Sequence, residues 1–206
     1  MALTKIRGNG IGTLGDGTTN DTKILFDGNA QDYHIGLDDS SDSLVIGKGS
    51  DLGTTPAITI DSSQRILKAH IPSFTVKAAN EWVDLGTSST TYFKDSVSTV
   101  DVVSNIGSHF DTSTGRFTAP VAGMYQFNIC LYNNNLGDAN HYMSIFKNGS
   151  GYNSVLGLYQ NADTAYPDNT NTLSISIDLN ASDYIEIQGT NDVYGGHSFF
   201  NGFLVG

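Results

Sequence analysis

The sequence has few residues that form cross-links or helices. Its 206 residues include one cysteine, Cys130, so no intrachain disulfide framework exists. Cys130 lies in an alternating apolar segment, residues 125–132, where we expect a small buried side chain and no reactive thiol. Stretches rich in alanine, glutamate and lysine are missing, whereas Gly, at 23 residues, and Ser, Thr, Asn and Asp are abundant. This composition favours an all-β protein.

Basic residues and long apolar runs are also scarce. Lys and Arg number 10 against 21 Asp and Glu, a net charge of −11, so the chain repels phosphate backbones and nucleic acid is not an expected partner. No segment approaches the ~20 apolar residues that a membrane span needs, which predicts no membrane insertion. The N-terminal sequence Met-Ala-Leu-Thr-Lys-Ile-Arg has no apolar run behind it, so we expect synthesis in a cytoplasm without an export signal.

Motifs of the common enzyme classes are missing as well. Nucleophile elbows, phosphate-binding loops, zinc-binding helices and paired zinc cysteines do not occur, and the five histidines are scattered. The chain is therefore not expected to be an enzyme.

Residues 1–70 consist of short apolar segments between long polar turns. Strands are expected at 24–26, 33–37, 44–46 and 58–60, several with polar–apolar alternation. The region is too polar for one chain to bury a core alone. It is either flexible or folded by intertwining with identical chains. The alternation favours the second alternative, a β-rich stalk in which three copies meet around one axis.

Residues 71–206 are richer in apolar and aromatic residues and alternate strongly. Tyr125, Phe127, Ile129 and Leu131 share one face of an expected strand. Asn148-Gly149 is a strong hairpin signal after the strand 142–147. Several such strands in this region predict an antiparallel two-sheet sandwich.

The stretch from Asn105 to Phe127 resembles the signature of the complement component 1q globular head and its tumour-necrosis-factor-like relatives. The matching residues, in order, are Gly107, Phe110, Gly115, Phe117, Pro120, Gly123, Tyr125 and Phe127. Residues 72–76, 147–149, 183–187 and 198–204 resemble further strands and turns of that head. The resemblance implies a jelly-roll sandwich of about ten antiparallel strands and a homotrimer.

Aromatic residues are the expected material of the trimer interface and the core. Phe199, Phe200 and Phe203 cannot all face one side of a sheet, so we expect a neighbouring subunit to bury at least one of them. Tyr125 and Phe127 belong to the same predicted interface or core set.

Two polar loops, 133–141 and 160–172, are the expected ligand-binding regions. The family resemblance implies calcium near the trimer axis, with Asp138, Asp163 and Asp168 as candidate ligands, although acidic loops are usually only solvated. No other cofactor is expected. Tyrosines among Asn, Gly, Ser and Asp are typical of recognition loops, where they stack on sugars or simply pack. These candidate receptor-binding residues are Tyr152, Tyr159, Tyr166 and Tyr194.

The N-terminal segment 27–39 resembles sequences of tail fibres and other structural proteins of marine bacteriophages. Together with the expected trimer, it predicts a virion protein, a tail fibre or other appendage, whose head binds a host cell-surface glycan or protein. Residues 1–70 would then contact other virion proteins. The alternatives are a purely structural trimerisation cap or capsid decoration protein, and a secreted lectin-like ligand.

Overall fold

The structure, a computed structural model, describes residues 14–15, 17, 19–86, 88, 90–134, 141–152, 158–160, 168–190 and 192–206. The chain divides into two compact units, residues 1–70 and 71–206. Apart from one 3-10 turn, η1 (Asp39–Ser41), the regular structure in these described ranges is all strand, which confirms the predicted all-β class. None of the described segments is a helix long and apolar enough to cross a membrane.

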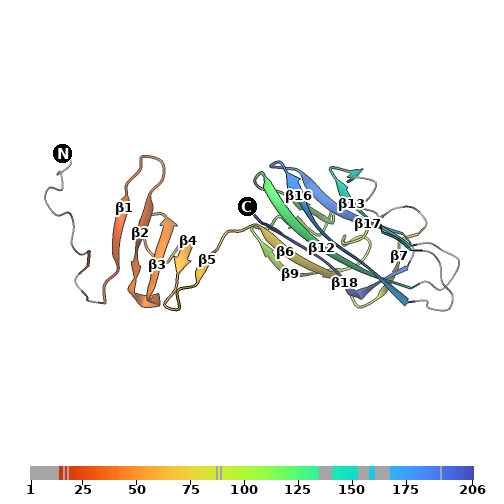
Figure 1. Cartoon of the computed structure of the whole chain (residues 1–206), viewed down its shortest axis with the longest axis horizontal. Coiled ribbons are helices and arrows are strands. Elements are labelled where there is room, and N and C mark those ends of the chain that lie inside the picture. The colour runs from red at the N-terminus through yellow and green to blue at the C-terminus, as the bar shows by residue number, and fades with distance from the viewer. Residues whose placement is uncertain are drawn as a thin grey trace. The chain divides into compact units, whose positions relative to one another are not determined.

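Unit 1 is one antiparallel sheet in which five strands follow each other in chain order, coloured red to yellow in Figure 1. The strands are β1 (Thr22–Phe26), β2 (Tyr33–Asp38), β3 (Ser43–Lys48), β4 (Pro56–Ile60) and β5 (Ile66–Lys68). The first four coincide with the predicted apolar segments. Sequence reasoning missed β5, because Ile66 and Leu67 stand in a polar run without alternation.

Unit 2 is a sandwich of two antiparallel sheets, seen with its strands in Figure 1. One sheet has the order β10-β11-β17-β13-β14, with β8 and β15 attached, and the other has the order β16-β12-β18-β6-β9, with β7 attached to β18. The first sheet comprises β8 (Thr90–Thr91), β10 (Phe110–Asp111), β11 (Arg116–Thr118), β13 (His141–Lys147), β14 (Ser150–Gly151), β15 (Leu158–Gln160) and β17 (Tyr184–Gly189). The second comprises β6 (Ser73–Ala78), β7 (Trp82–Asp84), β9 (Val100–Ile106), β12 (Gly123–Asn134), β16 (Asp168–Leu179) and β18 (Asp192–Leu204). The described strands of unit 2 exceed the expected ten because six of them, β7, β8, β10, β11, β14 and β15, are only two or three residues long.

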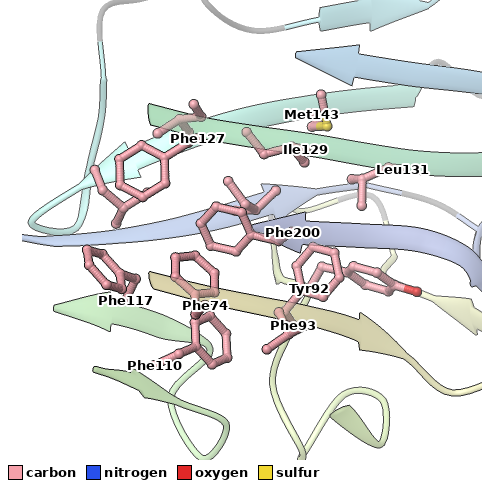
Figure 2. Packing of buried hydrophobic residues seen from close by; sticks show 14 of the residues in the cluster. Phe74, Tyr92, Phe93, Phe110, Phe117, Phe127, Ile129, Leu131, Met143 and Phe200 are labelled. Carbon is pink, nitrogen blue, oxygen red and sulfur yellow. The ribbon is translucent and has the colours of Figure 1, made fainter. Parts of the chain in front are cut away.

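Aromatic rings from both sheets fill the space between them (Figure 2). The Phe74 ring lies at the centre, with its centroid 5.0 Å from that of Phe110, 4.9 Å from Phe117 and 4.7 Å from Phe200. Phe110 and Phe117 face each other across the β10–β11 hairpin, as predicted. The alternating residues of β12 complete the core, because Tyr125, Phe127, Ile129 and Leu131 are all at most 2% exposed. A single chain therefore closes this core by itself.

Two turns of unit 2 also follow the sequence signals. Gly115 has φ +72°, and a Cβ there would lie 2.8 Å from the Phe93 carbonyl oxygen, so the β10–β11 turn requires glycine. Asn148 and Gly149 both have positive φ and form the expected hairpin turn between β13 and β14.

The boundaries of the predicted polar loops need correction. The prediction of a loop over 160–172 is wrong for residues 168–172, because they belong to β16 and pair with residues 130–134 of β12. Residues 133 and 134 likewise continue β12, and β13 begins at His141. The long strands β12 and β16 continue here with polar residues on both faces, including the buried Asn133 and Asn171, a pattern that resembles a loop in sequence.

Candidate functional site: the outward face of the six-stranded sheet

Two phenylalanines lie uncovered on the outward face of the six-stranded sheet. Along β18, Phe200 points into the sandwich and is fully buried, whereas Phe199 and Phe203 are 38% and 42% exposed. The alternation of side chains along a strand explains the difference, since residues 199 and 203 share the face opposite to residue 200. Within one chain, the predicted set therefore divides into core residues, Phe200, Tyr125 and Phe127, and outward residues, Phe199 and Phe203.

Uncharged polar side chains form a hydrogen-bonded network beside these rings. Gln126 donates from Nε2 to Ser174 Oγ over 2.9 Å, and Ser174 donates to Asn128 Oδ1 over 2.7 Å. Asn128 donates in turn to Asn201 Oδ1 over 2.9 Å, and Ser176 donates to Gln126 Oε1 over 2.6 Å. The network joins β16, β12 and β18 and holds its amide groups in place. The strands β12 and β18 thus present apolar and uncharged polar groups on this face, the composition typical of the buried centre of protein interfaces. Beside them, Lys77 lies cross-strand from Phe199 and pairs with Asp101 over 3.3 Å.

Cys130 lies in the same face, cross-strand from Phe199, and is 8% exposed. Burial raises the pKa of its thiol, which makes the reactive thiolate scarce at neutral pH. The structure therefore confirms the expected small buried residue.

A cluster of aromatic rings lies where β7 meets β18. The centroid of the Trp82 ring is 5.0 Å from that of Tyr194 and 6.1 Å from that of Tyr132. The His197 ring lies 5.2 Å from Tyr132 and 5.1 Å from Tyr194. Trp82 is 47% exposed and His197 is exposed, so the cluster offers ring faces and edges to solvent. We call these four residues the aromatic cluster.

The backbone around the aromatic cluster fixes its rings. Tyr194 donates its hydroxyl to Asn80 Oδ1 over 2.7 Å, and the Gly195 amide donates to the Glu81 carbonyl over 2.9 Å. A Cβ at Gly195 would lie 2.0 Å from the Ala79 carbonyl oxygen, so only glycine lets these two segments of the backbone approach this closely. The rings are thus held on paired strands before any ligand arrives.

The aromatic cluster accounts for one of the four predicted recognition tyrosines. Tyr194 belongs to it but lies in β18, so its prediction as a loop residue is wrong. Tyr159 is also in a strand, β15, where it pairs with Tyr142, and its side chain lies outside the described part of the structure. Tyr152 packs half-buried against the core, and Tyr166 lies outside the described residues.

Sequence reasoning missed Trp82, Tyr132 and His197. The one signal available was that Trp82 is the single tryptophan of the chain. Its position beside Tyr194 depends on pairing between strands more than a hundred residues apart.

The predicted calcium ligands cannot be assembled from the described residues. Asp138 and Asp163 lie outside the described residues. Asp168 is the first residue of β16, but its side chain is not among those that the structure describes. Among the side chains that are described, no group of three or more His, Cys, Asp or Glu is arranged to hold a metal ion. Calcium binding stays a prediction from the resemblance.

Comparison with known proteins places unit 2 in a family. Residues 74–205 match the C1q domain. The chain is also similar to the crystal structure of murine APRIL at pH 8.5, with 8% identity and a TM-score of 0.49 over 66% of this chain and 99% of that one. The chain is likewise similar to the globular domain of the zebrafish complement 1qA protein, with 16% identity and a TM-score of 0.44 over 66% of this chain and 98% of that one. Eiger TNF from S. frugiperda gives 13% identity and a TM-score of 0.48, with 66% and 93% covered. Because the matched residues make up more than half of the sequence, the chain belongs to the C1q domain family.

Proposed function

We propose that the chain is a structural virion protein, a tail fibre or other appendage, whose non-enzymatic head forms a homotrimer and binds a host cell surface. Trimers are typical of the C1q family. The observation that carries the proposal for this chain is the outward face with Phe199 and Phe203, two large apolar rings that one chain leaves exposed between uncharged side chains of β12 and the Lys77–Asp101 ion pair. Burial between three copies removes both rings from water.

The aromatic cluster supports recognition of a glycan. Rings held on strands bind with little loss of conformational freedom, and the apolar face of a sugar ring stacks on an exposed indole such as Trp82. Asn80 and His197 lie next to the rings as polar groups for hydroxyls. Three clusters per head give avidity to weak single contacts.

The position in a virion rests on the sequence of residues 27–39 and its similarity to phage fibre proteins. In this proposal, unit 1 connects the head to other virion proteins, and the protein is located in the virion. Immunogold labelling of purified particles tests that location, and label on the appendages is the expected result.

A purely structural role, as a trimerisation cap, is the second candidate. It is favoured by the Phe199 and Phe203 face, which requires no ligand. The two candidate functions assign different roles to the aromatic cluster. In host recognition the cluster binds the ligand, whereas in a structural cap it has no role.

Light scattering on the double variant Phe199→Ser/Phe203→Ser tests the trimer. We expect the wild type to have the mass of three chains and the variant to dissociate at micromolar concentration. Val121→Ser is the matched control, since Val121 is 47% exposed outside this sheet, and it should stay trimeric. A wild-type monomer would contradict the proposal.

Glycan-array binding and host adsorption of Trp82→Ala separate the two candidate functions. Retained trimer with lost glycan binding supports recognition, whereas retained trimer with unchanged binding and adsorption supports the structural cap. Dissociation of the trimer would instead assign the aromatic cluster to the subunit interface. The control is Val121→Ala, 47% exposed and outside this sheet, which should behave as the wild type.

A further inference from the structure

The sheet of unit 1 has an apolar face that its own described residues leave largely exposed, although Leu14 lines a groove beside Ile24, Ile35 and Leu37. Along β2, Tyr33 and Leu37 are exposed and Ile35 is half-buried, whereas the alternate residues 34, 36 and 38 are buried. Along β3 the pattern repeats, with Leu44 and Ile46 exposed and residues 43, 45 and 47 buried. The large apolar side chains of β2 and β3 therefore point to solvent, and the buried ones, apart from Val45, are small or polar.

The strand register aligns these side chains in rows across the sheet. Residues directly opposite in an antiparallel pair share one face. One row is Ile24, Ile35, Ile46 and Ile58, and the next is Leu37, Leu44, Ile60 and Ile66. Phe26 and Tyr33 begin a third row, which ends at Lys48. We call this surface the isoleucine face.

The opposite face is covered in part by the chain itself, although Leu25 at its edge strand stays exposed. The loop 49–55 folds over it, with Leu52 9% exposed and Val45 2% exposed. The His34 ring nitrogen Nδ1 lies 2.8 Å from the Gly49 carbonyl oxygen, and the Lys48 amide donates to the Thr55 carbonyl over 3.2 Å. In the described part of unit 1, the loop 49–55 therefore lies on the polar side of the sheet, while Leu14 lies beside the isoleucine face.

The size of the isoleucine face limits which partner can cover it. Five strands about 4.8 Å apart, with five or six residues at about 3.3 Å each, give a footprint of roughly 400 Å². A stable interface between two free proteins buries about 800 Å² on each partner. The face is large enough to need cover, yet too small to assemble separate molecules alone.

We infer that the isoleucine face is an interface between three copies of this chain, in which three sheets enclose one apolar axis as the sides of a prism. This inference rests on the trimeric head of the proposed function. Charge is compatible with it, because the two long rows contain no charged side chain except Lys68 at one end.

Trimerisation of the head, together with the short connection between the units, keeps three copies of unit 1 close together. Four residues, 69–72, separate the last strand of unit 1 from the first strand of unit 2, and they span at most about 14 Å. Three heads in one trimer therefore keep three sheets at an effective concentration in the millimolar range. At that concentration a small apolar face is sufficient.

Thiol labelling of two single-cysteine variants tests the interface. Both carry Cys130→Ser, and one adds Ile46→Cys while the matched control adds Leu25→Cys. Ile46 and Leu25 are each 41% exposed in the single chain but lie on opposite faces. In the trimer we expect Ile46→Cys to react with maleimide about tenfold more slowly than Leu25→Cys, because only the first is covered.

A short bismaleimide cross-linker identifies what covers the face. Cross-linked dimers from Ile46→Cys but not from Leu25→Cys support contact between copies. Slow labelling without cross-links means that another segment of the same chain is the cover and overturns the inference. Equal labelling rates overturn it as well.

A charge introduced in the full-length chain separates this inference from the trimeric head. Ile46→Asp should expose residues 22–68 to protease, with cleavage about tenfold faster than in Leu25→Asp, while light scattering still gives three chains. Equal cleavage of the two trimeric variants overturns the inference and leaves the head trimer standing. Loss of the trimer in the wild type refutes the proposed function instead.

Discussion

The two units of this protein differ in how the apolar faces of their sheets are covered. In unit 2 two sheets each turn an apolar face inward, and rings such as Phe74 and Phe200 meet in a core that one chain closes. In unit 1 a single sheet carries a comparable apolar face, with Ile46 still 41% exposed. Alternation along a strand thus shows which side chains share a face, but not whether the same chain supplies the cover.

The largest expected effect separates a ring in a closed core from one on an open face. Phe74→Ala should destabilise unit 2 by about 3–5 kcal/mol, because the cavity left among Phe110, Phe117 and Phe200 cannot collapse fully. Phe26→Ala in unit 1, where the ring is 58% exposed, should leave the unit 2 transition unchanged. Scanning calorimetry checks both, and equal shifts of that transition would contradict the independence of the two units.

Ion pairs give a second contrast between the units. In unit 2 Arg116 Nε lies 2.8 Å from Glu186 Oε2, and the Glu186 side chain is 3% exposed. Arg116→Ala should cost roughly 2 kcal/mol, since it leaves a buried carboxylate without its cation while water partly compensates near the exposed arginine. In unit 1 the Arg65 side chain that pairs with Asp61 is 73% exposed, so Arg65→Ala should cost less than Arg116→Ala. Urea unfolding measures both, and a larger loss for Arg65 would reverse the comparison.

Backbone strain sets a smaller effect in unit 2. Gly115→Ala places a side chain at φ +72° against the Phe93 carbonyl and should cost about 1–2 kcal/mol. Gly151→Ala is the control, because a Cβ there meets nothing within 4 Å. Equal melting temperatures for the two variants would show that the β10–β11 turn tolerates a side chain.

The smallest expected effect is a change in how stability depends on pH under acidic conditions. Hydrogen bonds from Asn148, then from Lys147 and the Asn180 amide, lower the pKa of Asp183 to about 2. Because the folded pKa lies below the unfolded value of about 3.9, the carboxylate stabilises the fold above about pH 4, and this contribution is lost as the pH falls toward 2. Asp183→Asn should therefore flatten the loss of stability between pH 4 and pH 2. An unchanged acid dependence in melting curves would exclude this carboxylate as a cause.

Local patterns made much of the fold predictable. Alternation gave the core residues of β12, and the glycine signals gave the turns at Gly115 and Asn148-Gly149. The aromatic cluster was not predictable, because Trp82, Tyr132 and Tyr194 come from three strands whose contact depends on long-range pairing. The Asn, Gly, Ser and Asp residues around Tyr194 predicted a loop, although the glycines that follow it allow close strand contact. The isoleucine face was visible as alternation, but its orientation away from the loop 49–55 needed the structure.

Hydrogen exchange on the Phe199→Ser/Phe203→Ser variant tests the central contrast most directly. In the trimer, amides of both β2–β3 and β12 should exchange slowly. After dissociation into single chains, we predict that β12 stays protected by its own core while β2 and β3 lose protection with the cover of their isoleucine face. Persistent protection of β2 and β3 in the single chain would show that unit 1 stands alone and would contradict the account.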